Sequence, residues 1–269
     1  MFFIRTRDCV KLAVYDPNPL GKETILMIHG WPLSAKMFEY QQELLIKCGY
    51  RVITMDLRGF GHSDAPACCY HYDQMASDID QVVRALHLHR FTLVGFSMGG
   101  AIVLRYMNRC RGYGVKKLVL LAAAAPRFTQ TPDFPYGMTQ DAVDQMIEQI
   151  QTDRAQFSED FSRKLLYSPH SEAIKDWFCD LSLSASSIGT IATGYALRDE
   201  DGCADLYSVH VPTGIFHGKQ DQIVPFELGE LQNQRIAGSQ LFAFENSGHG
   251  IFYDELERFN QCFLQFLKS

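Results

Sequence analysis

The chain has 269 residues, 46% of them hydrophobic and 21% charged, which predicts one large globular domain or a core that carries an insertion. Its formal net charge is -6 and its pI is about 5.8, so we expect neither nucleic acid nor an anionic membrane as a partner, since both require a concentrated basic face. No stretch approaches the ~20 apolar residues that span a bilayer, and the charged residues soon after Phe3 leave no room for a secretory signal.

The number and spacing of the cysteines indicate the cellular compartment. The chain has eight of them, scattered without a C-x-x-C pair, and the adjacent Cys68 and Cys69 are poorly placed for an ordinary disulfide with each other. We therefore expect reduced thiols in a cytoplasmic protein. The sequence also shows no phosphate loop, dinucleotide fingerprint or zinc-ligand spacing, so we predict no cofactor and no metal.

The first half of the chain alternates strand-like and helix-like segments, the pattern of a mostly parallel sheet covered by helices. In chain order the predicted elements are a strand at 25–28, a helix at 38–48, a strand at 51–55, a helix at 74–88, a strand at 91–94, a helix at 98–109 and a strand at 115–121. The run 25–28 is continuously apolar, which suits a strand buried on both faces. Residues 1–126 are thus interpreted as the first part of a core.

The pattern of apolar residues changes after residue 126. Strand-like runs vanish between 127 and 207, where helical apolar spacing covers 141–151, 157–166 and 173–183. We interpret residues 127–207 as a helical cap or lid over the sheet. Strands return at 213–216 and 241–244, and a helix is predicted at 255–267, so residues 208–269 complete the core.

The segment from Gly95 to Gly99 has the form G-x-S-x-G, with an apolar strand leading in and a helix leading out. At such a turn a serine takes a strained conformation that raises its hydroxyl above the sheet, and the following helix offers free N–H groups to an oxyanion. A simple helix cap would explain Ser97 but not the surrounding glycines, which include Gly100. We therefore predict that Ser97 is a nucleophile.

A serine hydroxyl needs a base within hydrogen-bond reach. Of nine histidines, His249 is the best candidate, because it lies between two glycines directly after a strand. Asp221 also follows a strand and can accept the other imidazole N–H. The rival acid position, after the strand 115–121, reads Ala-Ala-Ala-Ala-Pro and has no carboxylate. We predict Asp221 as the acid and expect His29 to be structural.

Acyl transfer also requires two backbone donors for the tetrahedral oxygen. The N–H of Met98, directly after the nucleophile, is the first candidate. The second should come from the loop after the strand 25–28. There Pro32 has no N–H and Gly30 is expected to turn the chain, so we predict Trp31 as the second donor.

Together these residues resemble the α/β-hydrolase superfamily. The motifs that carry the resemblance are His29-Gly30-Trp31-Pro32, Asp56-Leu57-Arg58-Gly59-Phe60-Gly61-His62-Ser63, Gly95 to Gly100, His217-Gly218 with Asp221, and Gly248-His249. The resemblance implies an α/β fold with a mostly parallel eight-stranded sheet flanked by helices, and a helical cap inserted after strand 6. Within the superfamily the chain is similar to the cofactor-free haloperoxidase, arylesterase and perhydrolase group. That group implies ester hydrolysis through an acyl-serine, and in some members peroxide replaces water; we connect Pro32 with that side reaction.

The sequence thus predicts a serine esterase that acts on a small-molecule carboxylic ester, with Ser97, Asp221 and His249 as its triad. A carbon–carbon bond hydrolase or a lactonase with the same triad stays open, as does a ligand sensor that retains the triad. Haloalkane and epoxide hydrolases use an aspartate nucleophile, which disfavours them here. The acyl and alcohol groups and the choice between monomer and homo-oligomer are left open by the sequence.

Overall fold

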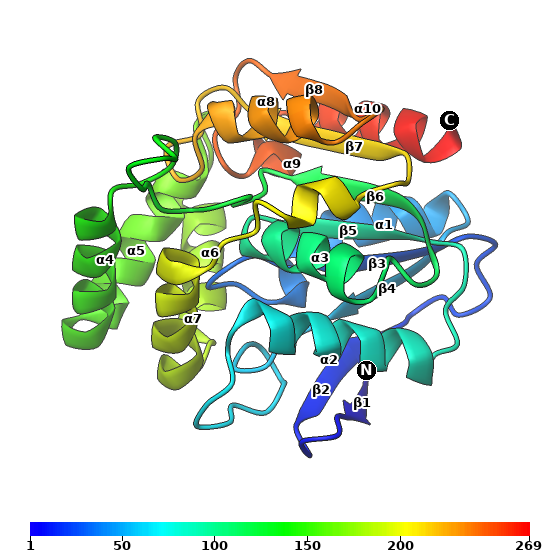
Figure 1. Ribbon diagram of the computed structural model, residues 1–269, viewed down its shortest axis with the longest axis horizontal. Coiled ribbons are helices and arrows are strands. Elements are labelled where there is room, and N and C mark those ends of the chain that lie inside the picture. The colour runs from blue at the N-terminus through cyan, green and yellow to red at the C-terminus, as the bar shows by residue number, and fades with distance from the viewer.

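The computed structural model describes residues 1–269, built around one sheet of eight strands (Figure 1). The strands are β1 (Phe2–Arg5), β2 (Lys11–Tyr15), β3 (Thr24–Ile28), β4 (Arg51–Met55), β5 (Phe91–Phe96), β6 (Val115–Leu121), β7 (Thr213–Gly218) and β8 (Gln240–Phe244). Their order is β1-β2-β4-β3-β5-β6-β7-β8. The hairpin of β1 and β2 pairs antiparallel, and β2 is antiparallel to β4, whereas every pair from β4 to β8 is parallel. The mostly parallel eight-stranded sheet is confirmed.

Helices cover both faces of this sheet. The core helices are α1 (Glu39–Lys47), α2 (Tyr72–Ala85), α3 (Met98–Arg109), α8 (Phe226–Arg235), α9 (Ile251–Asp254) and α10 (Leu256–Lys268), with two short 3₁₀ helices, η1 (Ala35–Phe38) and η2 (Asp205–Ser208). Figure 1 shows α2, α3 and α8 in front of the sheet, and α1 and α10 behind it. Because both faces are covered, central strands such as β5 are buried along their whole length. The longest helix, α2, has 14 residues, and none of the helices could cross a bilayer.

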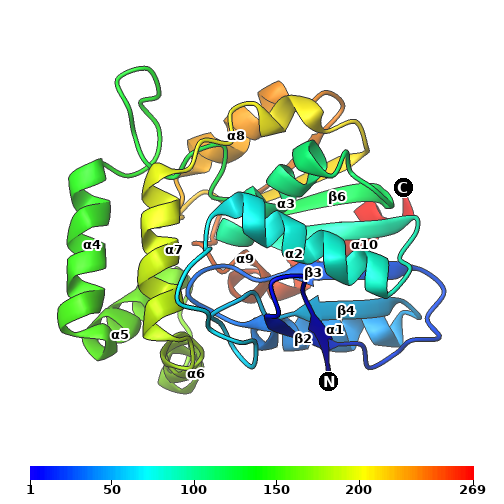
Figure 2. The ribbon, with the colours of Figure 1, turned by 60° about the horizontal axis from the view of Figure 1, so that its bottom comes forward.

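Four more helices lie between β6 and β7. They are α4 (Gln140–Thr152), α5 (Arg154–Leu165), α6 (Glu172–Leu183) and α7 (Ser187–Asp199). They gather on one side of the molecule, with α4 beside α7 and α5 against α6 (Figures 1 and 2). We call this group the helical insertion. Three of its helices match predicted segments, while the domain boundaries at 126 and 207 stay predictions.

The helix α7 is absent from the sequence prediction. Its sequence contains Gly189, Thr190, Thr193 and Gly194, which have low helix propensity and blur the apolar spacing. Tertiary contact explains these residues: a Cβ at Gly189 would lie 2.8 Å from the Cα of Gly59, so the helix and the loop after β4 touch through their backbones. The edge strands β1 and β2 and the helix α8 are also missing from the pattern-based prediction.

Candidate functional site

The predicted site residues follow the carboxyl ends of parallel strands. Trp31 comes after β3, Ser97 after β5, Asp221 after β7 and His249 after β8. These ends lie at one edge of the sheet, where ligands of open parallel sheets collect. The topology therefore brings together four residues that are far apart in the sequence.

Ser97 occupies a sharp turn between β5 and α3. Its φ is 54° and its ψ is -121°, a backbone conformation that residues with a Cβ rarely adopt. The side chain makes no capping hydrogen bond to the helix that it precedes, which removes helix capping as its explanation. A strained serine with an unused hydroxyl is the arrangement expected of a nucleophile.

The neighbouring glycines permit this turn. A Cβ on Gly95 would lie 2.6 Å from the Cγ2 of Val103, and one on Gly99 would run into the backbone oxygens of Ile28 and His29. A side chain at either position would push α3 away from the sheet. The glycine pattern therefore has a packing reason, as the sequence suggested.

His249 and Asp221 form a buried pair. The Nδ1 of His249 lies 2.7 Å from the Oδ2 of Asp221, and both side chains are fully buried. The other oxygen of Asp221 accepts the backbone N–H groups of Ile223 and Val224, each at 2.8 Å. Because the carboxylate can only accept, His249 donates from Nδ1, which leaves the lone pair on Nε2.

The surroundings keep Asp221 ionised. Burial acts to raise its pKa, but the charge of His249 and the hydrogen bonds from His217 and His249 outweigh it and hold the pKa well below its usual range. His217, at the end of β7, donates from Nε2 to the carbonyl oxygen of Val224 at 2.8 Å and lies 3.4 Å from Asp221. The sequence alone predicts no separate role for His217, although His217 is part of the His-Gly motif that precedes Asp221.

The Nε2 of His249 is buried and has no hydrogen-bond partner. Its ring packs on Phe96, the residue before Ser97, with ring centroids 4.7 Å apart. No hydrogen bond joins Ser97 to His249 in this structure. The ring thus lies next to the turn that holds Ser97, and catalytic contacts of this kind often tighten only when substrate binds.

The two proposed oxyanion donors differ in their setting. Met98 is the first residue of α3, so its N–H is one of the four that a helix leaves without an internal acceptor. The N–H of Trp31 makes no backbone hydrogen bond, and the indole Nε1 donates to the carbonyl oxygen of Thr190 in α7 at 3.0 Å. The Trp31 ring also packs against Phe157 of α5, at 5.4 Å between centroids. The helical insertion thus holds the loop that carries Trp31.

His29 stabilises the same loop from below. It is fully buried, its Nδ1 donates to the carbonyl oxygen of Gly30 at 2.9 Å, and its Nε2 accepts the N–H of Leu57 at 3.0 Å. Burial lowers its pKa, which favours the neutral form. Both ring nitrogens are occupied, which agrees with the structural role expected of His29.

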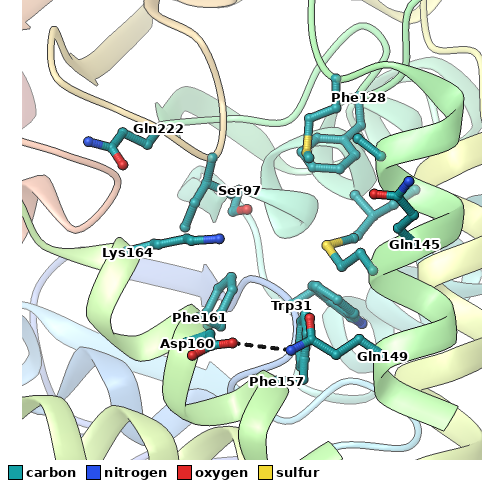
Figure 3. Close-up of a pocket in the computed structure, with 15 residues that line it drawn as sticks. Trp31, Ser97, Phe128, Gln145, Gln149, Phe157, Asp160, Phe161, Lys164 and Gln222 are labelled. Carbon is teal, nitrogen blue, oxygen red and sulfur yellow. Dashed lines mark hydrogen bonds between the residues drawn. The ribbon is translucent and has the colours of Figure 1, made fainter. Parts of the chain in front are cut away.

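A cavity of about 260 Å³, which we call the Ser97 cavity, has Ser97 in its lining (Figure 3). The helical insertion forms most of its wall. Its lining residues are Trp31, Ser97, Phe128, Met138, Ala142, Gln145, Met146, Gln149, Phe157, Asp160, Phe161, Lys164, Leu197, Gln222 and Ile223. Asp221 and His249 lie outside this lining. The cavity is largely apolar and small, so it suits a small organic molecule.

A buried carboxylate ties the helical insertion to the loop of His249. Asp254, in α9, is fully buried and accepts the backbone N–H groups of Gly248 at 2.7 Å, Tyr167 at 2.9 Å and Ser168 at 3.0 Å. His170 donates to it from Nε2 at 2.9 Å. One carboxylate therefore joins the segment between α5 and α6 to the segment that holds the predicted base.

We expect Asp254→Ala to lower the free energy of unfolding by about 2 kcal/mol, because three backbone N–H groups and the His170 ring lose their shared acceptor. Urea denaturation followed by circular dichroism measures this value. The control is Asp176→Ala, which removes an exposed aspartate of α6 and should change stability by less than about 0.5 kcal/mol. Equal losses in the two variants would contradict the role assigned to Asp254.

Comparisons with known proteins agree with this architecture. A model of the alpha/beta hydrolase fold family matches residues 23–256. The AB hydrolase superfamily protein YisY of Bacillus subtilis is 46% identical over 99% of both chains. Among solved structures, an esterase from Exiguobacterium antarcticum is 46% identical, with a TM-score of 0.97 over 100% of this chain and 99% of that one. A bromoperoxidase from Bacillus anthracis is 34% identical, with a TM-score of 0.92 over 97% and 96%. The chain is a member of the α/β-hydrolase family and is similar to its esterases and haloperoxidases.

Proposed function

We propose that the protein is a serine esterase that cleaves a small-molecule carboxylic ester through an acyl-Ser97 intermediate. The observation that carries the proposal is the buried His249–Asp221 pair, which leaves an unpartnered Nε2 beside the turn of a strained serine. This arrangement satisfies the chemical requirement for a serine nucleophile, which needs a base that a carboxylate orients. The similarity to an esterase supports the choice of an ester as substrate.

In the first step the Oγ of Ser97 attacks the ester carbonyl carbon while the Nε2 of His249 takes the hydroxyl proton. The N–H groups of Trp31 and Met98 stabilise the resulting oxyanion. When the tetrahedral intermediate collapses, the carbon–oxygen bond to the alcohol breaks and His249 gives its proton to the departing oxygen. Asp221 stays ionised throughout and stabilises the imidazolium.

In the second step water attacks the acyl-serine, and His249 acts again as the base. The similarity to a bromoperoxidase supports the proposal that hydrogen peroxide can replace water here and give a peracid as a side product. The eight cysteines are all free, which supports a reducing compartment such as the cytoplasm.

A fluorophosphonate probe tests the proposed nucleophile, because it reacts with a serine hydroxyl only when a base activates it. We expect the probe to label Ser97, with the position read by peptide mass spectrometry, and His249→Ala to abolish labelling. Ser158→Ala, which removes a buried serine of α5 that does not line the Ser97 cavity, is the control and should be labelled like the unmodified protein. Absence of label on a folded sample would favour the ligand sensor over the esterase.

A further inference from the structure

Lys164 supplies the only positive charge in the lining of the Ser97 cavity. It lies in the last turn of α5, and Figure 3 shows its side-chain nitrogen pointing into the cavity on the side of Ser97. The rest of the lining is apolar except for three glutamines, Asp160 and Ser97 itself. A single ammonium group therefore faces the space in which a substrate would bind.

This ammonium group has no acidic partner, although one lies at helical spacing. Asp160 is four residues before Lys164, the separation at which a lysine and an aspartate on a helix normally pair. Here the Oδ2 of Asp160 accepts the side-chain amide of Gln149 at 3.1 Å, and the Oδ1 accepts that of Gln156 at 3.0 Å. Both carboxylate oxygens therefore accept a glutamine amide, and no ion pair joins Asp160 to Lys164; the bond to Gln149 is dashed in Figure 3.

The adjacent residue Arg163 behaves differently. It forms ion pairs with Glu159 at 3.0 Å and with Glu172 at 2.9 Å, on the outer side of the helical insertion. Both residues are exposed to solvent, but only Arg163 is ion-paired and only Lys164 lines the Ser97 cavity. Lys164 is therefore an exposed lysine that differs from Arg163 in two respects: it lines the Ser97 cavity, and no carboxylate pairs with it.

Lys164 also lies between the Ser97 cavity and a second cavity, because it lines both of them. This second, outer cavity measures about 550 Å³; Asp160, Lys164 and Gln222 line both cavities, and the ion-paired Arg163 lines the outer one alone. An anion that approaches through the outer cavity would meet the ammonium group before it reached the nucleophile. Because Lys164 is exposed and Asp160 lines the same cavity, water and the neighbouring carboxylate weaken the attraction between this anion and the ammonium group without removing it.

We infer that the Ser97 cavity is built for esters whose acyl chain ends in a carboxylate, that is, monoesters of short dicarboxylic acids. The carboxylate would pair with Lys164 while the ester carbonyl lies at Ser97, and the apolar lining would contact the methylene groups between them. This inference rests on the proposed esterase function and adds the substrate class.

The test compares two esters of the same size and shape, monomethyl glutarate and its uncharged amide, methyl 5-amino-5-oxopentanoate. We expect the unmodified protein to prefer the anionic ester about threefold in kcat/KM, since an ion pair with a solvent-exposed lysine strengthens binding only modestly. Lys164→Gln should bring the ratio close to one, Lys164→Glu should invert it, and Lys164→Arg should keep it above one. The preference should also shrink as the salt concentration rises.

The matched control is Lys268→Gln, which removes an exposed lysine at the end of α10 and should leave the ratio as it is in the unmodified protein. A ratio of one in the unmodified protein would overturn the inference. So would a ratio that Lys164→Gln leaves in place, or that Lys268→Gln lowers equally.

A binding measurement separates this inference from the esterase proposal. Dissociation constants of the two esters for Ser97→Ala are measured by ligand-observed NMR, where no turnover is needed. A preference for the anionic ester that disappears in the double variant Ser97→Ala, Lys164→Gln supports the Lys164 site even if neither ester is hydrolysed. Equal constants for the two esters overturn it even if both are hydrolysed.

Discussion

Replacing Ser97 with alanine is expected to lower kcat/KM for p-nitrophenyl acetate by about 10⁴-fold or more. The substitution removes the oxygen that forms the acyl-enzyme, so only substrate binding and the oxyanion donors remain to accelerate hydrolysis. The fold should survive, because the Ser97 hydroxyl makes no capping hydrogen bond and alanine adds no atoms. Steady-state kinetics measures the loss, and the burst of p-nitrophenol that accompanies acyl-enzyme formation should vanish.

The control for this variant is Ser182→Ala, in α6. Ser182 is a buried serine whose Oγ lies 2.8 Å from that of Ser158, away from the Ser97 cavity. This control tests whether the loss of any buried serine hydroxyl lowers kcat/KM by destabilising the fold. We expect Ser182→Ala to retain its activity. A normal burst of p-nitrophenol from the Ser97→Ala protein would contradict the acyl-serine mechanism.

Asp221→Asn is expected to lower kcat by about 10⁴-fold with little change in KM. The introduced amide can still accept the N–H groups of Ile223 and Val224, so the loop keeps its shape. Its nitrogen, however, would face the Nδ1 of His249, which must then accept rather than donate. The ring proton moves to Nε2, and the imidazole loses the lone pair that takes the proton of Ser97. Comparison with Asp176→Asn controls for the loss of one negative charge.

The same variant has a predicted pH signature. The folded-state pKa of Asp221 lies below its unfolded value of about 3.9, so its ionised form stabilises the fold above that pH. This stabilisation is lost as the pH falls through the folded-state pKa. The difference in unfolding free energy between the unmodified protein and Asp221→Asn should therefore be largest near neutral pH and shrink below pH ~4. A difference that grows on acidification would contradict the depressed pKa.

Several features of this protein follow from the sequence because they depend on local rules. Buried strands appear as short apolar runs, and an amphipathic helix such as α2 or α10 places apolar residues at regular spacing. The turn at Ser97 can be predicted from five consecutive residues, because one sharp bend requires both the glycines and the serine. Asp221 and His249 could be chosen because both follow strands, and parallel strands end at a common edge.

Other features were decided only by the tertiary structure. The helix α7 forms in spite of its glycines because Gly189 packs against the loop after β4 and Gly194 against Ile147 of α4. Asp254 binds Tyr167 and Ser168, which are 87 and 86 residues away, and no local pattern marks that contact. A substrate-binding role for Lys164 can be inferred only from the folded structure. There two glutamines donate hydrogen bonds to the Asp160 carboxylate, and the ammonium group of Lys164 points into the cavity on the side of Ser97. Periodicity and turn chemistry act between residues close in sequence, whereas a cavity and its charges arise from surfaces that meet only when the chain has folded.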